Sequence, residues 1–192
     1  MKKLLIFTFL SIIILGCSST KNETNKESEK LTNEVVASEI LFQVRTSNKE
    51  DLEIFEDGII PWISIKEPEN SLVNLIDKDE IVLNSNKAIL SIDYPLNKPT
   101  EIEIRSKEKD GFSRIELIRL ISQAYHRIYD EEEASAKVKT VPLKKREDLI
   151  NRNETDGKYG IWGHDIGDLD LSAIIVQSKN GITPKLVLYI ES

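Results

Sequence analysis

The residues best suited to chemistry gather between positions 151 and 170, in the string NRNETDGKYGIWGHDIGDLD. The string contains His164, one of only two histidines in the chain, and Trp162, one of only two tryptophans. Glycine accepts positive φ and lets other backbone approach closely. The stretch has four glycines, at positions 157, 160, 163 and 167. They therefore predict an ordered loop with a specific path.

One interpretation of this stretch is a metal site. An imidazole and three carboxylates fall within a short span, and such groups bind Ca²⁺ or transition ions. The spacing does not match an EF-hand loop, which ends in a closing glutamate. The candidate ligands are His164, Asp165, Asp168 and Asp170.

A second interpretation is an envelope hydrolase or glycan-active enzyme. His164 would act as a general base oriented by Asp165 or Asp168, and Trp162 and Tyr159 would be aromatic platforms for substrate. Acid–base catalysis needs groups with tuned pKa values that meet in one pocket, and adjacency in the sequence does not establish such a meeting. The sequence has neither a nucleophile elbow nor an H-E-x-x-H motif, and it indicates no cofactor.

The third interpretation, which we favour, is structural. Ile161 and Trp162 would close the end of the core, while the glycines allow the turns. His164 and the aspartates would hydrogen-bond exposed backbone amides, as Asp does in Asx turns.

One long helix and a set of strands must position this loop. The sequence S113-R-I-E116 has the form of a capping box, and Phe112 can staple onto Leu117. An apolar stripe of helical period follows, so we expect a helix from Ser113 to about Asp130 that packs on a sheet. Fraying is expected after it, because an acidic run suits a helix C-terminus poorly.

Short runs of alternating or β-branched apolar residues predict the strands. The turn formers D77-K78-D79-E80 separate two of them, and S178-K-N-G181 suits a hairpin between the last two. Strands, one helix and then strands indicate an α+β fold, with an antiparallel, sandwich-like sheet and one long amphipathic helix packed on it. The expected strands are 40–45, 59–66, 71–75, 81–83, 88–94, 100–106, 170–177 and 185–190.

The N-terminus has the three parts of an export signal in residues 1–16: a basic head, an apolar run too short to span a bilayer, and the small residue Gly16. The string I14-L15-G16-C17 resembles the lipobox of bacterial lipoproteins. The resemblance implies that Cys17 carries diacylglycerol, commonly with a further acyl chain such as palmitate, and becomes the mature N-terminus. Cys17 is the only cysteine, which excludes an internal disulfide and cysteine catalysis.

Residues 17–37 comprise this cysteine and a polar segment whose composition predicts a flexible tether. Residues 38–192 are expected to form a single domain. Removal of residues 1–16 leaves 24 basic and 33 acidic side chains. That balance argues against a nucleic-acid partner.

The string of residues 159–169, YGIWGHDIGDL, resembles a block in uncharacterised proteins, chiefly of the Bacteroidota. The resemblance covers the chain from about Thr100 onward and implies no activity. We expect a cell-envelope lipoprotein that binds a protein or envelope component, and the absence of aspartate after Cys17 favours the outer membrane in a diderm. The alternative is the hydrolase or metal-binding domain centred on His164.

Overall fold

The fold is assembled from strands that lie far apart in the sequence. The computed structural model describes residues 36–146, 151–179 and 181–192, and these belong to one compact unit. The signal segment, Cys17 and all but the end of the tether lie outside the described residues. In chain order the elements are β1 Val36–Leu41, β2 Val44–Arg45, α1 Lys49–Ile54, β3 Ile59–Ile60, β4 Ile63–Ser64, η1 Pro68–Asn70, η2 Leu72–Asn74, β5 Ile81–Leu83, β6 Lys87–Ile92, β7 Thr100–Arg105, β8 Phe112–Ser113, α2 Arg114–Ser135, η3 Leu143–Lys145, η4 Ile166–Asp168, β9 Asp170–Lys179 and β10 Ile182–Glu191.

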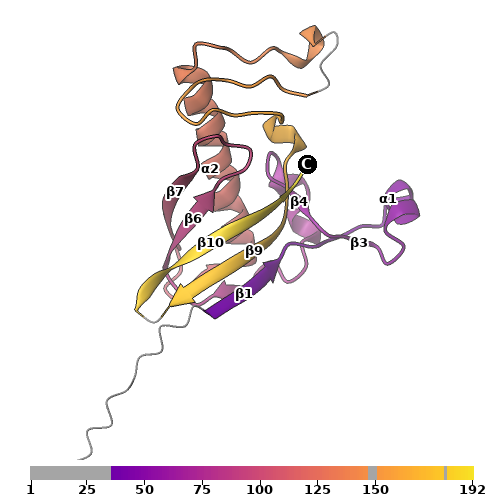
Figure 1. The fold of residues 1–192 in the computed structure, drawn as a ribbon. Coiled ribbons are helices and arrows are strands. Elements are labelled where there is room, and N and C mark those ends of the chain that lie inside the picture. The colour runs from indigo at the N-terminus through magenta and orange to yellow at the C-terminus, as the bar shows by residue number, and fades with distance from the viewer. Residues whose placement is uncertain (1–35, 147–150, 180) are drawn as a thin grey trace, which may run out of the picture. The chain divides into compact units, whose positions relative to one another are not determined.

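The largest sheet has six strands, five of which follow the order β1-β9-β10-β6-β7 (Figure 1). The sixth, β4, pairs with β9 just beyond the end of β1. All pairs are antiparallel except β10 with β6, which is parallel. The predicted α+β fold, with antiparallel strands and one main helix, is confirmed, and the parallel pairing of β10 with β6 makes the sheet a mixed one. The chain passes through β7, α2 and β9 before β10 reaches β6.

The helix α2 begins where the capping signal predicts. Ser113 is its N-cap, and the Ser113 hydroxyl accepts a hydrogen bond from the Glu116 N–H at 3.3 Å. The Glu116 side chain does not close a capping box but accepts from Ser106 Oγ and Lys107 N. The apolar stripe is buried against the sheet, and its buried members include Leu117, Ile118, Ile121, Ala124, Tyr125 and Ile128.

The helix ends later than the sequence predicts. It continues through the acidic run to Ser135, so both the expected end near Asp130 and the expected fraying are wrong. The cause is Glu132, which is buried and held by the loop that follows. Tertiary contacts therefore override an unfavourable charge at this helix terminus.

The segment 71–75 is also not the strand that its apolar residues suggested. It forms the short 3₁₀ helix η2, directly after η1. Leu72 and Leu75 are buried while Val73 is exposed, a spacing of three residues that fits a 3₁₀ turn rather than the alternation of a strand.

The helix α1 was not predicted. It has six residues and none of them is buried, so it lacks the apolar stripe by which a helix is recognised in a sequence. No helix in the described part of the chain is long and apolar enough to cross a membrane.

Candidate functional site

The carboxylate of Glu132 organises the glycine-rich loop between α2 and β9. This side chain is fully buried, with 0% of the residue exposed. Its Oε1 accepts from Thr155 Oγ1 at 2.6 Å and Gly157 N at 2.8 Å. Its Oε2 accepts from Tyr159 N at 2.7 Å and Gly160 N at 3.1 Å. One helical side chain thus holds four donors of the loop.

These donors also set the charge state of Glu132. Burial by itself raises the pKa of a carboxyl group. Here the Thr155 hydroxyl and the backbone N–H groups of Tyr159, Gly157 and Gly160 outweigh burial, so the pKa of Glu132 is lowered from its ordinary value of 4.5. The carboxylate is therefore ionised at neutral pH. Because its oxygens already accept four hydrogen bonds, its role is to anchor the loop rather than to transfer protons.

Two of the four glycines are required by this geometry. A Cβ atom on Gly157 would lie 2.7 Å from both the carboxylate and the backbone oxygen of Glu132. Gly160 has φ +66°, and a Cβ there would lie 3.2 Å from Asn97. The ordered path expected from the glycines is thus explained at these two positions by close approach and by positive φ.

Asp165, a predicted catalytic or metal-binding residue, is instead paired with arginine. Arg146 donates to it through two nitrogens, with Nη1–Oδ2 and Nη2–Oδ1 distances of 2.8 Å and 3.0 Å. Arg152 Nε lies 3.7 Å from Oδ1, and both arginine side chains are only 3% exposed. The hydrogen bond from Arg146 to Asp165 raises the pKa of Arg146. Such bidentate pairing is strong, and it engages both carboxylate oxygens of Asp165.

Arg152 also contacts the rest of the loop's surroundings. Its Nη2 donates to Thr140 Oγ1, and its guanidinium lies over the Tyr129 ring, 5.5 Å from the centroid. Its Nη1 is buried and has no hydrogen-bond partner among the described residues. The ring contact offsets part of the cost of burying this cation.

Asp168 also serves the backbone. Its Oδ2 accepts from the Asp165 N–H at 2.8 Å and closes the capping box of η4. The prediction that these aspartates hydrogen-bond backbone amides is confirmed for Asp168. Neither Asp165 nor Asp168 orients the His164 ring, which contacts the rings of Tyr94 and Trp162 and forms no hydrogen bond with any residue that the structure describes.

His164 belongs to an aromatic cluster with Trp162 and Tyr94. The ring centroids of Tyr94 and Trp162 lie 5.3 Å apart, and those of Tyr94 and His164 lie 5.5 Å apart. Trp162 is 38% exposed whereas Ile161 is fully buried. Ile161 therefore closes the core as expected, but the same expectation is wrong for Trp162.

Tyr159 is not part of this cluster. It is buried, and its hydroxyl donates to Glu131 Oε2 at 2.6 Å. The prediction that Trp162 and Tyr159 together form an aromatic platform is therefore wrong, since the buried Tyr159 presents no open ring face to a substrate.

Asp170, the last metal candidate, lies within the sheet at the start of β9, opposite Glu191 of β10 and Ser64 of β4. Burial, together with the charge of Glu191, raises its pKa. Within the described residues, no group of three or more His, Cys, Asp or Glu side chains is placed to hold a metal ion. The four predicted ligands are thus not brought together.

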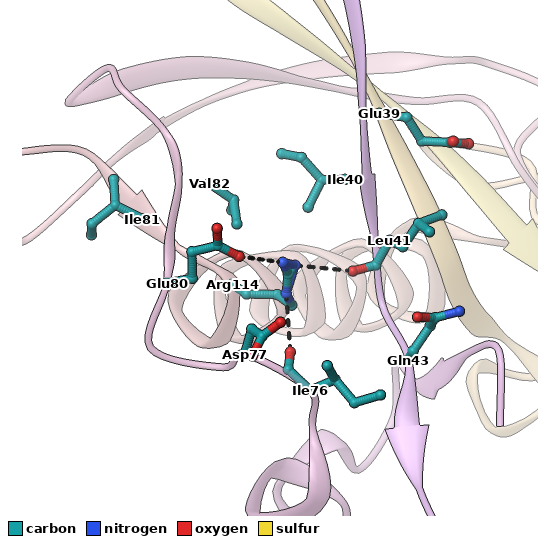
Figure 2. Close-up of a pocket in the computed structure, with 10 residues that line it drawn as sticks. All are labelled: Glu39, Ile40, Leu41, Gln43, Ile76, Asp77, Glu80, Ile81, Val82 and Arg114. Carbon is teal, nitrogen blue, oxygen red and sulfur yellow. Dashed lines mark hydrogen bonds and ion pairs between the residues drawn. The ribbon is translucent and has the colours of Figure 1, made fainter. Parts of the chain in front are cut away.

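A groove on another part of the domain was not predicted from the sequence. It encloses about 420 Å³ between β1 and the segment leading into β5 (Figure 2). Arg114, in the first turn of α2, crosses its floor and is 12% exposed. The Arg114 guanidinium donates to Leu41 O at 3.3 Å, to Ile76 O at 3.2 Å and to Glu80 Oε2 at 2.8 Å. Arg114 thereby holds the two walls at a fixed separation.

Comparison with protein-family models, with curated proteins and with solved structures gives no match for this chain. The resemblances noted for residues 14–17 and 159–169 therefore stay predictions. Sequence reasoning missed Glu132 and Arg114 because each looks like one more charged residue of a helix. The only signal in the sequence was the position of Glu132 in an acidic run at a helix end, where ionised carboxylates are unfavourable.

Proposed function

We propose that this protein is a lipid-anchored lipoprotein of the cell envelope, on the outer membrane in a diderm, whose domain of residues 38–192 binds an envelope component. The lipobox-like string ending at Cys17 supports the anchor. Several acyl chains, at about 0.8 kcal/mol per buried CH₂, make such an anchor long-lived. The anchor fixes the protein's location and leaves the domain to do the recognition.

The observation that carries the binding role is the groove beside β1. Its volume of about 420 Å³ falls within the range of ligand sites, roughly 300–1,000 Å³. Other hollows of the surface have similar or larger volumes, and this groove differs from them in having a largely buried cation, Arg114, fixed between its walls. By contrast, the carboxylates of Glu132, Asp165 and Asp168 in the catalytic candidate region are engaged in contacts that hold the loop. Recognition at the groove, rather than catalysis at the loop, is therefore the activity that the geometry supports best.

The anchor is tested by Cys17→Ala in cells that process lipoproteins. The wild-type protein should incorporate an alkyne analogue of palmitate and partition into detergent, while the variant should do neither. Membrane retention and lipid labelling of the Cys17→Ala protein would refute the anchor without bearing on the groove.

Binding at the groove is tested by cross-linking from engineered cysteines. Because the lipid would block Cys17, Ile81→Cys in the groove wall would be the only free thiol, to be labelled with a benzophenone maleimide in intact cells. Ile182→Cys, on the β9–β10 hairpin, is the matched control, since both isoleucines are solvent-accessible. Light should produce one discrete adduct with an envelope component from position 81 and none from 182. Equal adducts from both positions, or none from either, would refute the groove as a binding site.

A further inference from the structure

The outer edge of β1 has unpaired main-chain groups. Phe42 N donates to Ser172 O at 2.9 Å, which makes this a hydrogen-bonded pair of the antiparallel ladder. Such pairs alternate with non-bonded ones. The N–H and C=O groups of Ala37, Glu39 and Leu41 therefore point away from β9. Of these, Leu41 O accepts from Arg114, while in the described part of the chain Ala37 and Glu39 have no main-chain partner on that side.

The groove lies against this same edge. Figure 2 shows β1 on one side and the segment from Asp77 to Val82 on the other, with Arg114 between them. The far wall leads into β5, whose only strand partner in the described structure is β8. A peptide entering the groove would thus meet a strand edge on one side and Ile81 and Val82 on the other.

The side chains beside the edge define what such a peptide must carry. Ile40 points across the groove toward Val82, whereas Glu39 points to the opposite face of the sheet (Figure 2). Glu39 is exposed and forms no ion pair with any described residue. Residues directly opposite on neighbouring strands interact through their side chains. A partner strand should therefore alternate an apolar residue beside Ile40 with a basic residue opposite Glu39.

The other edge of the sheet lacks this charge. On β7 the outward-facing Glu103 is already paired with Arg105 at 2.6 Å and with Lys87 at 3.4 Å. Burial acts to raise the pKa of Glu103, but the hydrogen bond from Lys87 and the charges of Arg105 and Lys87 together outweigh it, so that this pKa is lowered. A basic segment thus has an unpaired carboxylate to meet on β1 but not on β7.

We propose that the groove binds an extended polypeptide segment of alternating apolar and basic residues, which adds to the sheet as a strand along β1. This inference rests on the proposed binding function and names the partner's chemistry. Strand addition of this kind takes affinity from main-chain hydrogen bonds and selectivity from alternate side chains. At the far wall Glu80 is already paired with Arg114, whereas Asp77 forms no ion pair with any described residue and adds acidic character that favours the same partner.

The test uses the full-length lipoprotein in detergent and a fluorescent peptide of alternating lysine and valine, with binding read by anisotropy. A glutamate–valine peptide should bind at least tenfold more weakly, since it places like charge opposite Glu39. The lysine–valine peptide with N-methyl groups at alternate residues keeps its charge but loses its donors, and it should also bind about tenfold more weakly, as expected for one or two lost hydrogen bonds. Equal binding of the methylated peptide would show simple charge attraction and overturn the proposal.

The matched protein variants are Glu39→Pro and Glu103→Pro. Each removes one carboxylate and one N–H that points away from the sheet, where proline is tolerated on an edge strand. The outward direction at Glu103 follows from the bond of Ser106 N to Asn86 O in the β6–β7 ladder. Glu39→Pro should weaken binding of the lysine–valine peptide about tenfold, and Glu103→Pro should leave it unchanged.

Equal losses in the two proline variants, or no binding by the wild type, would overturn the proposal. The methylated-peptide comparison does not depend on how well either variant folds. A discrete adduct at Ile81→Cys without peptide binding would retain the proposed binding function and reject only the extended basic partner.

Discussion

Replacing Glu132 with Gln is the sharpest test of how the glycine-rich loop is held. The variant keeps the shape of the side chain but removes its charge, and its amide nitrogen must face two of the four donors that now bind oxygen. Hydrogen bonds to a charged group contribute about 1.5–3 kcal/mol each, and a buried donor left without an acceptor costs a further ~1–3 kcal/mol. We therefore expect a loss of about 3–5 kcal/mol in the free energy of unfolding.

The assay is urea unfolding followed by circular dichroism, with thermal unfolding as a second measure. The midpoint temperature should fall by roughly 10 °C for a domain of this size, and the m-value should not change. Glu133→Gln is the control, because that exposed neighbour lies in the same turn without touching the loop beyond Lys139 and Thr140. A Glu132→Gln protein within about 1 kcal/mol of wild type would refute the account of Glu132 as the anchor.

Four further predictions follow from the same region. Gly157→Ala should destabilise the domain by more than about 2 kcal/mol, because the new Cβ would collide with the backbone oxygen of Glu132. Gly163→Ala should cost only about 1 kcal/mol, because Gly163 has φ +73° but no described atom lies within 4 Å of the new Cβ. Urea unfolding of the two variants measures the difference. Asp165→Asn should lower the free energy of unfolding by about 3–5 kcal/mol, because Arg146 and Arg152 would stay buried without the charge of Asp165. The urea midpoint should therefore fall, and it should fall less in Asp168→Asn. The stability contributed by Glu132 should be complete above its unfolded-state pKa near 4.5 and lost as pH falls through the lower folded-state pKa, so a pH series should show a steeper acid loss in wild type than in Glu132→Gln. His164→Ala should lower the free energy of unfolding by less than about 1 kcal/mol, because the ring makes only partly exposed aromatic contacts. If this variant instead unfolds, the aromatic cluster with Trp162 and Tyr94 is needed for stability.

The elements with strong local signals could be predicted from the sequence. The start of α2 is encoded by Ser113, and the β9–β10 hairpin by the turn that ends at Gly181. What could not be predicted depends on contacts between distant residues. The extension of α2 to Ser135 needs a loop more than twenty positions away, and the parallel pairing of β10 with β6 leaves no local pattern.

The candidate site illustrates the same division. The stretch 151–170 was correctly identified as an ordered loop, but the partners of its aspartates could not be known. Arg146 directly follows Lys144 and Lys145, and such a basic run is typical of a solvated surface, yet the Arg146 side chain is buried against Asp165. Charged residues are ambiguous in this way because the same residue types form both solvated surface charges and buried ion pairs. The groove is harder still, since its walls come from three segments that only the fold places together.

The pairing of β1 with β9 joins the two ends of the described chain, so the sheet cannot be completed before β9 is available. Ala37 lies opposite Gln177, and β10 then joins the hairpin to β6. Contacts of such long sequence separation slow folding, because a large loop must close before they form. While the C-terminal hairpin is still emerging, β1 has no strand to join and the sheet has no centre. In a chain exported as proposed, the sheet would therefore remain incomplete, and the segments before it unfolded, until β9 and β10 have crossed the membrane.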